Sequence, residues 1–139
     1  MHLYNKLLGF LVKKGKKNKA KNVLDNAFSI VSEKTGYSMA YILFKVFLKL
    51  NVFVEAKTVR VKRRSHIVPF SLSLKRRSYL IIKWLIKSVS DNQKKINSSS
   101  KIAEEIFCLI NNTNSKALKL RNLNNNLSLS NRSNIHYRW

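Results

Sequence analysis

Positively charged side chains are the residues of this sequence best suited to chemistry, and the chemistry they favour is phosphate binding. Lys and Arg number 28 against six acidic residues, which gives a formal net charge of +22 at pH 7. Solubility requires far less charge, so the excess indicates an anionic partner, either a nucleic acid or an anionic membrane. The cations are densest between Glu55 and Arg77, where eight of them accompany a single acid.

This basic stretch has the pattern of an antiparallel β-hairpin arm that runs from about residue 52 to residue 75. Its first half is strand-like in composition, and its second half places apolar residues at every second position. That alternation predicts a half-buried strand, and arms of about ten residues would project roughly 30 Å. The residues expected on the buried face of the second strand are Val68, Phe70, Leu72 and Leu74.

Two interpretations of the basic hairpin are open. Charged side chains on a strand edge can prevent aggregation between sheets, but one or two lysines are enough for that purpose. Eight cations that repel one another gain the free protein nothing, whereas a polyanion would relieve the repulsion. The pattern therefore favours a basic arm that contacts phosphates.

Helical periodicity flanks the hairpin on both sides and predicts about six helices. The expected ranges are about 3–13, 18–36, 39–50, 76–89, 102–110 and 115–130. Gly15 and Gly36 are expected to end the first two helices, and Asn18 and Ser38 to cap the second and third. Four asparagines between 122 and 126 should weaken the last helix. The sequence thus predicts one mainly α domain over residues 1–139, a bundle of about six helices with one protruding antiparallel β-hairpin arm.

Acids, histidines and cysteine give no pattern for catalysis or metal binding, so no enzyme activity, metal or cofactor is expected. Glu104 and Glu105 would point about 100° apart on a helix, which suits surface acids better than an acid–base pair. A nuclease that uses them with His66 is a third alternative for the function. The histidines are scattered, and Cys108 lies among apolar residues, where a buried structural thiol is expected.

The C-terminal tail, residues 132–139, combines aromatic and basic side chains. His136, Tyr137, Arg138 and Trp139 could stack on bases and bind phosphates. The alternative is an aromatic tail that folds back onto the domain. Because no acid follows Glu105, RNA contact is the favoured interpretation.

A membrane partner is the alternative from another class. The longest apolar run, Met39–Val54, is interrupted by polar residues and is shorter than the ~20 residues that a membrane span needs. Amphipathic helices at 3–13 and 38–50 could still lie on a membrane surface. A cationic membrane-surface protein would not explain the basic hairpin.

Several motifs, in the same order along the chain, make this sequence resemble the ribosomal small-subunit protein S-seven family. They are Gly15-Lys16-Lys17, Val54-Glu55-Ala56-Lys57, Val68-Pro69, Arg76-Arg77, Lys83-Trp84-Leu85 and the ending His136-Tyr137-Arg138-Trp139. The resemblance implies a helical bundle with a hairpin arm that binds the 3′ major domain of small-subunit rRNA and nucleates assembly of the subunit head. The hairpin would lie near exit-site tRNA and the mRNA exit, beside neighbouring small-subunit head and platform proteins. No membrane partner and no homo-oligomer are expected.

Carried over residue by residue, the resemblance implies RNA contacts by Lys16, Lys17, Lys57, Arg60, Arg76, Arg77, Lys119, Arg121, His136, Tyr137, Arg138 and Trp139. The basic clusters add Lys13, Lys14, Lys62, Arg63, Arg64, Lys75, Lys116 and Arg132 to the expected RNA-binding residues.

The sequence also departs from the family pattern. Lys62-Arg63 replaces the glycine pair at the hairpin tip, so a longer or differently shaped turn is expected. The family's basic arm before the first helix is expected to be missing, and no presequence is expected. With heavy use of Lys, Asn, Ile and Leu, this divergence indicates an A/T-rich organellar genome. A mitochondrial protein is expected, with a plastid or a bacterial cytoplasm as the alternatives.

Overall fold

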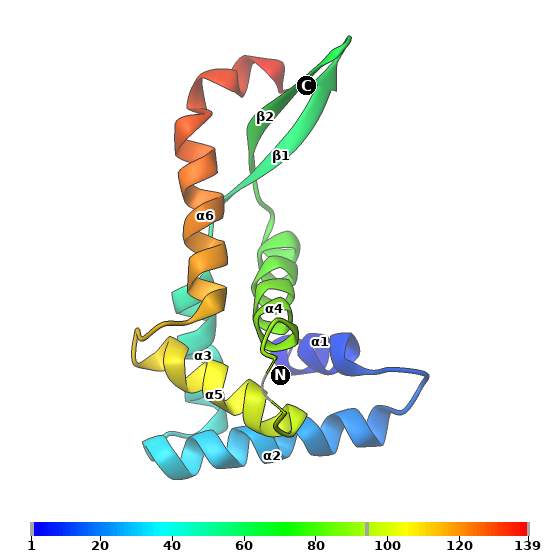
Figure 1. The fold of residues 1–139 in the computed structure, drawn as a ribbon, viewed down its shortest axis with the longest axis vertical. Coiled ribbons are helices and arrows are strands. Elements are labelled where there is room, and N and C mark those ends of the chain that lie inside the picture. Colours follow the sequence, from blue (N-terminus) through cyan, green and yellow to red (C-terminus); the bar gives the residue numbers. More distant parts are fainter. Residues whose placement is uncertain (1, 94, 139) are drawn as a thin grey trace.

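The computed structural model describes residues 2–93 and 95–138. Within them the elements are α1 (His2–Leu11), α2 (Lys17–Thr35), α3 (Met39–Leu50), β1 (Val54–Val61), β2 (Arg64–Ser71), α4 (Leu74–Ser90), α5 (Ser98–Ile110), α6 (Lys116–Ser130) and the 3₁₀-helix η1 (Arg132–Tyr137). Helices α2 and α5 form a base (Figure 1). Helices α4 and α6 lie side by side and connect this base with the hairpin at the far end; the chain runs toward the base in α4 and away from it in α6. The prediction of a mainly α fold with one antiparallel hairpin arm is confirmed.

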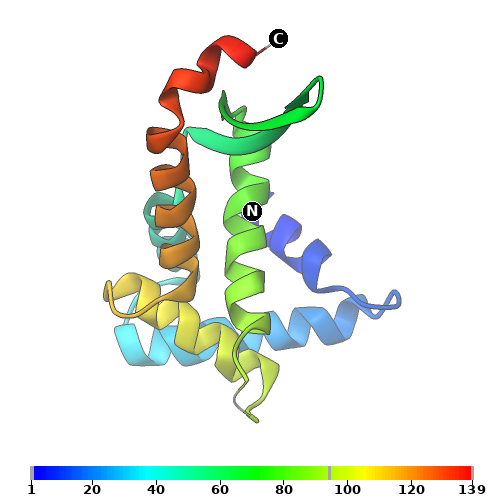
Figure 2. The ribbon, with the colours of Figure 1, turned by 45° about the horizontal axis from the view of Figure 1, so that its top comes forward.

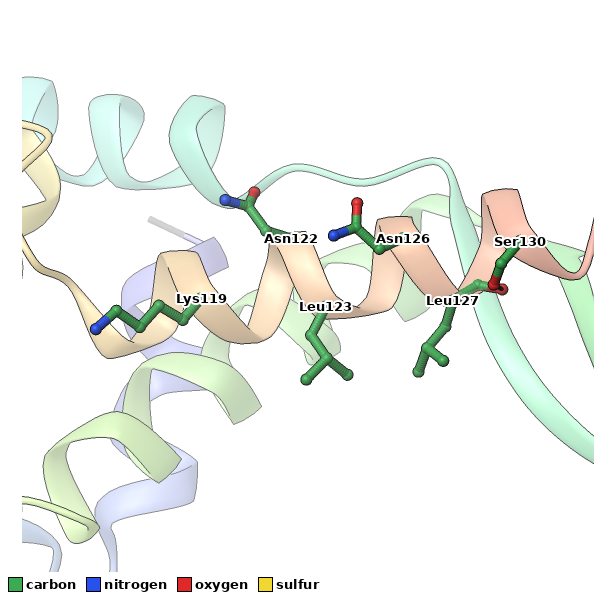
Figure 3. Close-up of a pocket in the computed structure, with 6 residues that line it drawn as sticks. All are labelled: Lys119, Asn122, Leu123, Asn126, Leu127 and Ser130. Atoms are coloured by element: carbon green, nitrogen blue, oxygen red, sulfur yellow. Dashed lines mark hydrogen bonds between the residues drawn. The ribbon is translucent and has the colours of Figure 1, made fainter.

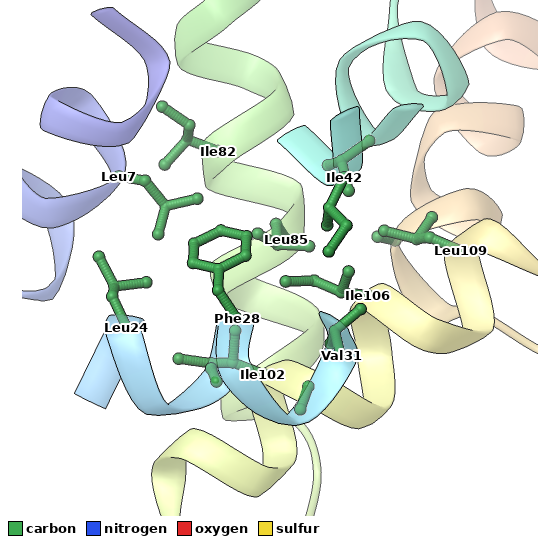
Figure 4. Close-up of a cluster of buried hydrophobic side chains, with 14 of the residues drawn as sticks. Leu7, Leu24, Phe28, Val31, Ile42, Ile82, Leu85, Ile102, Ile106 and Leu109 are labelled. Carbon is green, nitrogen blue, oxygen red and sulfur yellow. The ribbon is translucent and has the colours of Figure 1, made fainter. Parts of the chain in front are cut away.

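The main hydrophobic core lies where α1, α2, α3, α4 and α5 meet (Figure 4). The expected stripes of α2, α3 and α5 are buried there, with Leu24, Ile42 and Leu109 fully shielded from solvent. Complete burial of such a side chain stabilises the fold by about 1.5–3 kcal/mol. The periodicity of apolar residues therefore identified the helices that build the base.

A second, smaller core joins the hairpin to α4. It contains Val52 and Leu72, which flank the two strands, together with Leu80 and Trp84 of α4. The backbone N–H of Leu72 donates to the carbonyl of Phe53, 2.9 Å away, and so ties the two ends of the hairpin together. Both ends of the arm are thus fixed on one helix, which sets where the arm begins.

Local capping explains several of the helix boundaries. Ser38 accepts a hydrogen bond from the backbone N–H of Tyr41, and Gly36 ends α2 with φ +70°, as predicted. The prediction that Asn18 caps α2 is wrong, because α2 begins at Lys17 and no side chain caps it. Helix α1 ends at Leu11, earlier than predicted, so the residues up to Gly15 form a linker.

The second strand ends earlier than its apolar alternation suggests. β2 stops at Ser71, and Ser73 then caps α4 by accepting from the N–H of Arg76. Leu74 therefore begins a helix and is 72% exposed, so its predicted place on a buried strand face is wrong. Each strand has eight residues, which corresponds to an arm of roughly 25 Å.

Helix α6 is continuous despite its asparagines, so the expected weakening does not interrupt it. Within the described part of the chain, no helix combines the length and the apolar character needed to cross a bilayer.

Candidate nucleic-acid interface

The hairpin tip presents exposed cations on a tight turn. Val61 pairs with Arg64, so Lys62 and Arg63 form a two-residue turn, which excludes a longer turn, one of the two alternatives that the sequence left open. Lys62 has φ +54°, and Arg63 does not share a positive φ, which is the pattern of a type II′ turn. Arg60, Lys62, Arg63 and Arg64 are all exposed, and none of the four has an acidic partner within the described residues.

Polar side chains from the end of the chain bind the outer edges of both strands. Asn124 of α6 donates its Nδ2 to the Val54 carbonyl (2.8 Å) and accepts with Oδ1 from the Ala56 N–H (3.2 Å). On the other edge, Asn134 donates to the Ile67 carbonyl at 3.0 Å, and Arg138 donates to the Pro69 carbonyl. We call these the edge contacts. They leave the tip of the arm uncovered and hold its base.

Pro69 fits this arrangement because it lies on an outer edge. It pairs with Ala56, whose own N–H points outward to α6 rather than across the hairpin. A proline N has no hydrogen to donate, and at this edge no cross-strand bond is lost. The residue that would interrupt a central strand is therefore compatible with the hairpin.

Glu55 connects the base of the hairpin to α4. Its two carboxylate oxygens accept from Arg76 Nε at 3.0 Å and Arg76 Nη2 at 2.8 Å, and Lys57 Nζ lies 3.7 Å away. Burial acts to raise the pKa of Glu55, but the hydrogen bonds and charge of Arg76, with the charges of Lys57 and Lys83, hold it below its usual range. The one acid of the arm thus fixes Arg76 in place.

Arg77 is also held by the protein. Its Nε donates to the Leu72 carbonyl at 3.2 Å, and its guanidinium lies 4.3 Å from the ring centroid of Phe53. Arg76 similarly lies over the ring of Tyr79. Of the three cations predicted at the start of α4, Lys75 alone is exposed to solvent. Arg76 and Arg77 are half-buried, so their positions are fixed before any ligand binds.

The C-terminal tail folds back onto β2, which is the alternative that the sequence left open. The ring of Tyr137 stacks on His66 with centroids 4.3 Å apart and an interplanar angle of 17°. Arg138 lies over the ring of Phe70 in addition to its bond to Pro69. Arg132 and His136 are exposed, and Trp139 lies outside the described residues. RNA contact by the tail stays a prediction, and it would involve side chains already attached to the arm.

The loop between α1 and α2 forms a separate basic site, which we call the lysine loop. Lys13, Lys14, Lys16 and Lys17 are all exposed, and a hollow of about 380 Å³ is lined by residues 15–19. No side chain caps α2, and although the Lys17 N–H donates to the Gly15 carbonyl at 2.8 Å, the N–H groups that follow it in the first turn are available to an anion beside these lysines. In Figures 1 and 2 this loop lies at the base of the molecule, away from the hairpin.

The predicted cations of α6 have mixed surroundings. Lys116 Nζ donates to the Asp91 carbonyl at the end of α4, and Arg121 donates to the Lys49 carbonyl at the end of α3. Lys119 is exposed on the outer face of α6, beside a hollow of about 480 Å³. Figure 3 shows that this hollow lies along a single helix, so it is an open face rather than an enclosed site.

Two expectations about side chains of α5 are corrected by the structure. Glu105 is half-buried and accepts from Ser115 Oγ at 2.6 Å and from the Ala117 N–H at 3.0 Å, so it caps α6 rather than facing solvent. Cys108 is partly exposed, so it is not the buried thiol that was expected. Among the described residues, no three His, Cys, Asp or Glu side chains are grouped as metal ligands.

The structure therefore gathers the predicted residues into two main groups. The hairpin, the start of α4 and the tail share one end of the molecule, whereas the lysine loop lies at the base (Figures 1 and 2). Lys83 was named only within the Lys83-Trp84-Leu85 motif and not among the expected RNA contacts, although it lies seven residues after Arg76 and so on the same helix face. The roles of Asn124 and Asn134 were not predicted, because an asparagine that binds a distant strand has no local signature.

Comparison with known proteins gives a consistent result. The family model described as "Ribosomal protein S7p/S5e" matches residues 1–132. The protein named "Small ribosomal subunit protein uS7" from Geobacter metallireducens is 33% identical over 134 residues, which cover 96% of this chain and 85% of that protein. The protein of the same name from Geotalea daltonii is 34% identical with the same coverage. That from Thermomicrobium roseum is 29% identical and covers 99% of this chain and 86% of its own length. The resemblance noted in the sequence is confirmed, and the chain belongs to the ribosomal protein S7 family.

Proposed function

We propose that this chain is a structural constituent of the small ribosomal subunit that binds small-subunit rRNA and catalyses no reaction. The observation that carries the proposal is the basic hairpin tip, where Arg60, Lys62, Arg63 and Arg64 are exposed on a supported arm. Cations held in this way neutralise phosphates without a large loss of conformational freedom on binding. Recognition would then depend on RNA shape and phosphate positions more than on base sequence.

Family membership supports the finer part of the proposal. The RNA would be the 3′ major domain, and binding would nucleate assembly of the subunit head. The arm would lie near exit-site tRNA and the mRNA exit, with head and platform proteins as neighbours. The lysine loop, the start of α4, Lys116, Lys119, Arg121 and the tail are the other proposed contacts within the single domain of residues 1–139.

For location, we propose a mitochondrial small ribosomal subunit. The heavy use of Lys, Asn, Ile and Leu supports an A/T-rich organellar genome. The relatives named above are bacterial, so a bacterial cytoplasm is the principal alternative, with a plastid as the third. Sequencing the genomic locus and its flanking genes would decide among the three.

The test of RNA binding is its salt dependence on a fragment that contains the 3′ major domain. If about eight phosphates are neutralised, log K should fall with log salt with a slope of about −6 to −7. A fourfold rise in salt would then lower the affinity about 10⁴-fold. A nearly flat response would contradict the proposal. So would vesicle binding in the absence of RNA affinity, which the membrane-surface alternative predicts.

The contribution of the hairpin arm to RNA binding can be measured with the triple variant Lys62→Ala, Arg63→Ala, Arg64→Ala. Each lost phosphate contact should make the slope less steep by up to about 1. A control triple variant, Lys34→Ala, Lys45→Ala, Lys87→Ala, removes the same charge from helix positions outside the two groups of predicted RNA contacts. An equal change of slope in both variants would indicate that net charge alone, rather than the arm, accounts for binding.

A further inference from the structure

A hollow of about 310 Å³ lies between the α3–β1 link and the last turns of α6. Its lining includes Asn51 and Phe53 from the link, and Asn125 and Leu129 from α6. Phe53 is 62% exposed and Leu129 is 68% exposed, so two large apolar side chains stand at its opening. We call it the Phe53 hollow. None of these four residues belongs to the predicted RNA contacts.

Phe53 is held in position although it is exposed. Its carbonyl accepts from the N–H of Leu72, and the guanidinium of Arg77 lies 4.3 Å from its ring centroid. Arg77 itself is not among the residues that line the hollow. The ring is therefore a fixed stacking surface, because a ligand would not have to order it on binding.

The polar groups of the hollow suit the edge of a base. Asn51 and Asn125 carry side-chain amides, which offer both donors and acceptors. Asn51 Oδ1 is shielded from solvent and has no hydrogen-bond partner among the described residues. A ligand that donated to this amide, after a small rotation of the side chain, would satisfy it. Base edges present donors of this kind.

The charge around the hollow distinguishes a nucleotide from an apolar peptide. Arg77 lies against Phe53, and Arg121 binds the Lys49 carbonyl just before the link. Glu55, the nearest acid in sequence, is already paired with Arg76. A base that enters the hollow would bring two flanking phosphates, and these cations favour them.

We propose that the Phe53 hollow takes one unpaired nucleobase of a bound RNA strand, which stacks on Phe53 with its edge against Asn51 and Asn125. This inference rests on the RNA binding proposed above, and it adds a base-stacking contact outside the predicted RNA-binding residues. The hollow would hold a base from a single-stranded segment, because a base inside a duplex cannot leave its neighbours without cost.

The test compares Phe53→Leu with Phe44→Leu in binding to the 3′-domain fragment. Phe44 is a matched control, since it is 56% exposed on α3 and does not line the hollow. Loss of the stacking surface should weaken binding about fivefold or more, since stacking of one base is worth about 1–3 kcal/mol. The salt slope should not change, because no phosphate contact is removed. Phe44→Leu should match the parent.

Phe53→Trp keeps a ring at the site and separates a folding defect from a lost contact. This variant should bind like the parent, and its added indole fluorescence should be quenched by RNA relative to the parent protein. If the parent binds RNA with a steep salt slope but Phe53→Leu binds equally well, the base-binding inference is wrong and the proposed function stands. Equal losses in Phe53→Leu and Phe44→Leu would also overturn it. A parent that fails to bind RNA would overturn the proposed function itself.

Discussion

Replacing Asn124 with Ala should loosen the hairpin while leaving its cations intact. The Asn124 amide makes two hydrogen bonds to the outer edge of β1, one to the Val54 carbonyl and one from the Ala56 N–H. The Asn124→Ala substitution would leave both backbone groups without these partners. The arm would still be joined to α4 through Val52 and Leu72, but its direction would be less constrained.

The expected loss of unfolding free energy follows from the two hydrogen bonds and from the higher helix propensity of Ala, which opposes it. A hydrogen bond of this kind contributes about 0.5–1.5 kcal/mol net, so two are worth about 1–3 kcal/mol. Ala is the better helix former, and Asn→Ala in a helix recovers up to about 0.7 kcal/mol. Asn126→Ala is the matched control, since Asn126 is an exposed residue of the same helix. The control should be neutral or slightly stabilising, and the difference between the two variants should be about 1–3 kcal/mol.

Urea unfolding measures this difference, and hydrogen exchange locates it. The Ala56 amide should exchange slowly in the parent and in Asn126→Ala, and much faster in Asn124→Ala. Amides of α2 and α5 should be unaffected under conditions of local opening. Equal stability of the two variants, or fast exchange of the Ala56 amide in the parent, would refute the role of Asn124 at the edge of β1.

Three further changes test other contacts. The pKa of Glu55 is lower in the folded than in the unfolded protein, so its pairing stabilises the protein above about pH 4.3, and this stabilisation is lost as the pH falls through the folded pKa. Urea unfolding of Glu55→Gln should therefore show a deficit in unfolding free energy at pH 7 that shrinks as the pH is lowered, and a deficit independent of pH would contradict this. Lys62→Gly should raise the thermal midpoint or leave it unchanged, because a positive φ costs a lysine about 1–2 kcal/mol and glycine little; a clear decrease would argue against the turn geometry. Tyr4→Phe removes the 2.6 Å bond from the tyrosine hydroxyl to Asp25 and should lower the unfolding free energy by about 1–3 kcal/mol. Burial and Asp25 raise the pKa of Tyr4 to about 12, so its contribution should persist below about pH 10 and be lost as the pH rises toward 12, and an unchanged unfolding curve would refute it.

Local patterns predicted the helical part of this fold well. The Ser38 cap, the left-handed Gly36 and the apolar stripe of α2 all depend on residues within one or two turns of one another. Such information is present in any short stretch of sequence. The same reasoning failed at Leu74, because the apolar alternation continued past the point where the Ser73 cap starts a helix.

Long-range contacts account for what the sequence could not provide. Asn124 was interpreted through its weak helix propensity, whereas its partners lie 68 and 70 residues away. Arg76 was expected to contact RNA from its charge and from the family resemblance, and the structure shows that Glu55 holds it. A count of charged residues indicates the sign of the partner's charge. It does not distinguish a cation that faces solvent from one that an acid or an aromatic ring already engages.

The edge contacts also have a consequence for the order in which the molecule acquires its shape. Both strands are complete once synthesis has reached Ser71. The side chains that hold their edges, however, belong to residues 124–138. A ribosome making this protein therefore completes the arm, and the α4 residues that hold its base, before the edge contacts exist. Until Asn134 and Arg138 bind the edge of β2, the nascent chain would carry every cation of the tip on a hairpin whose orientation is less constrained. The rigid form that suits a fixed RNA site is available only at the last stage of synthesis.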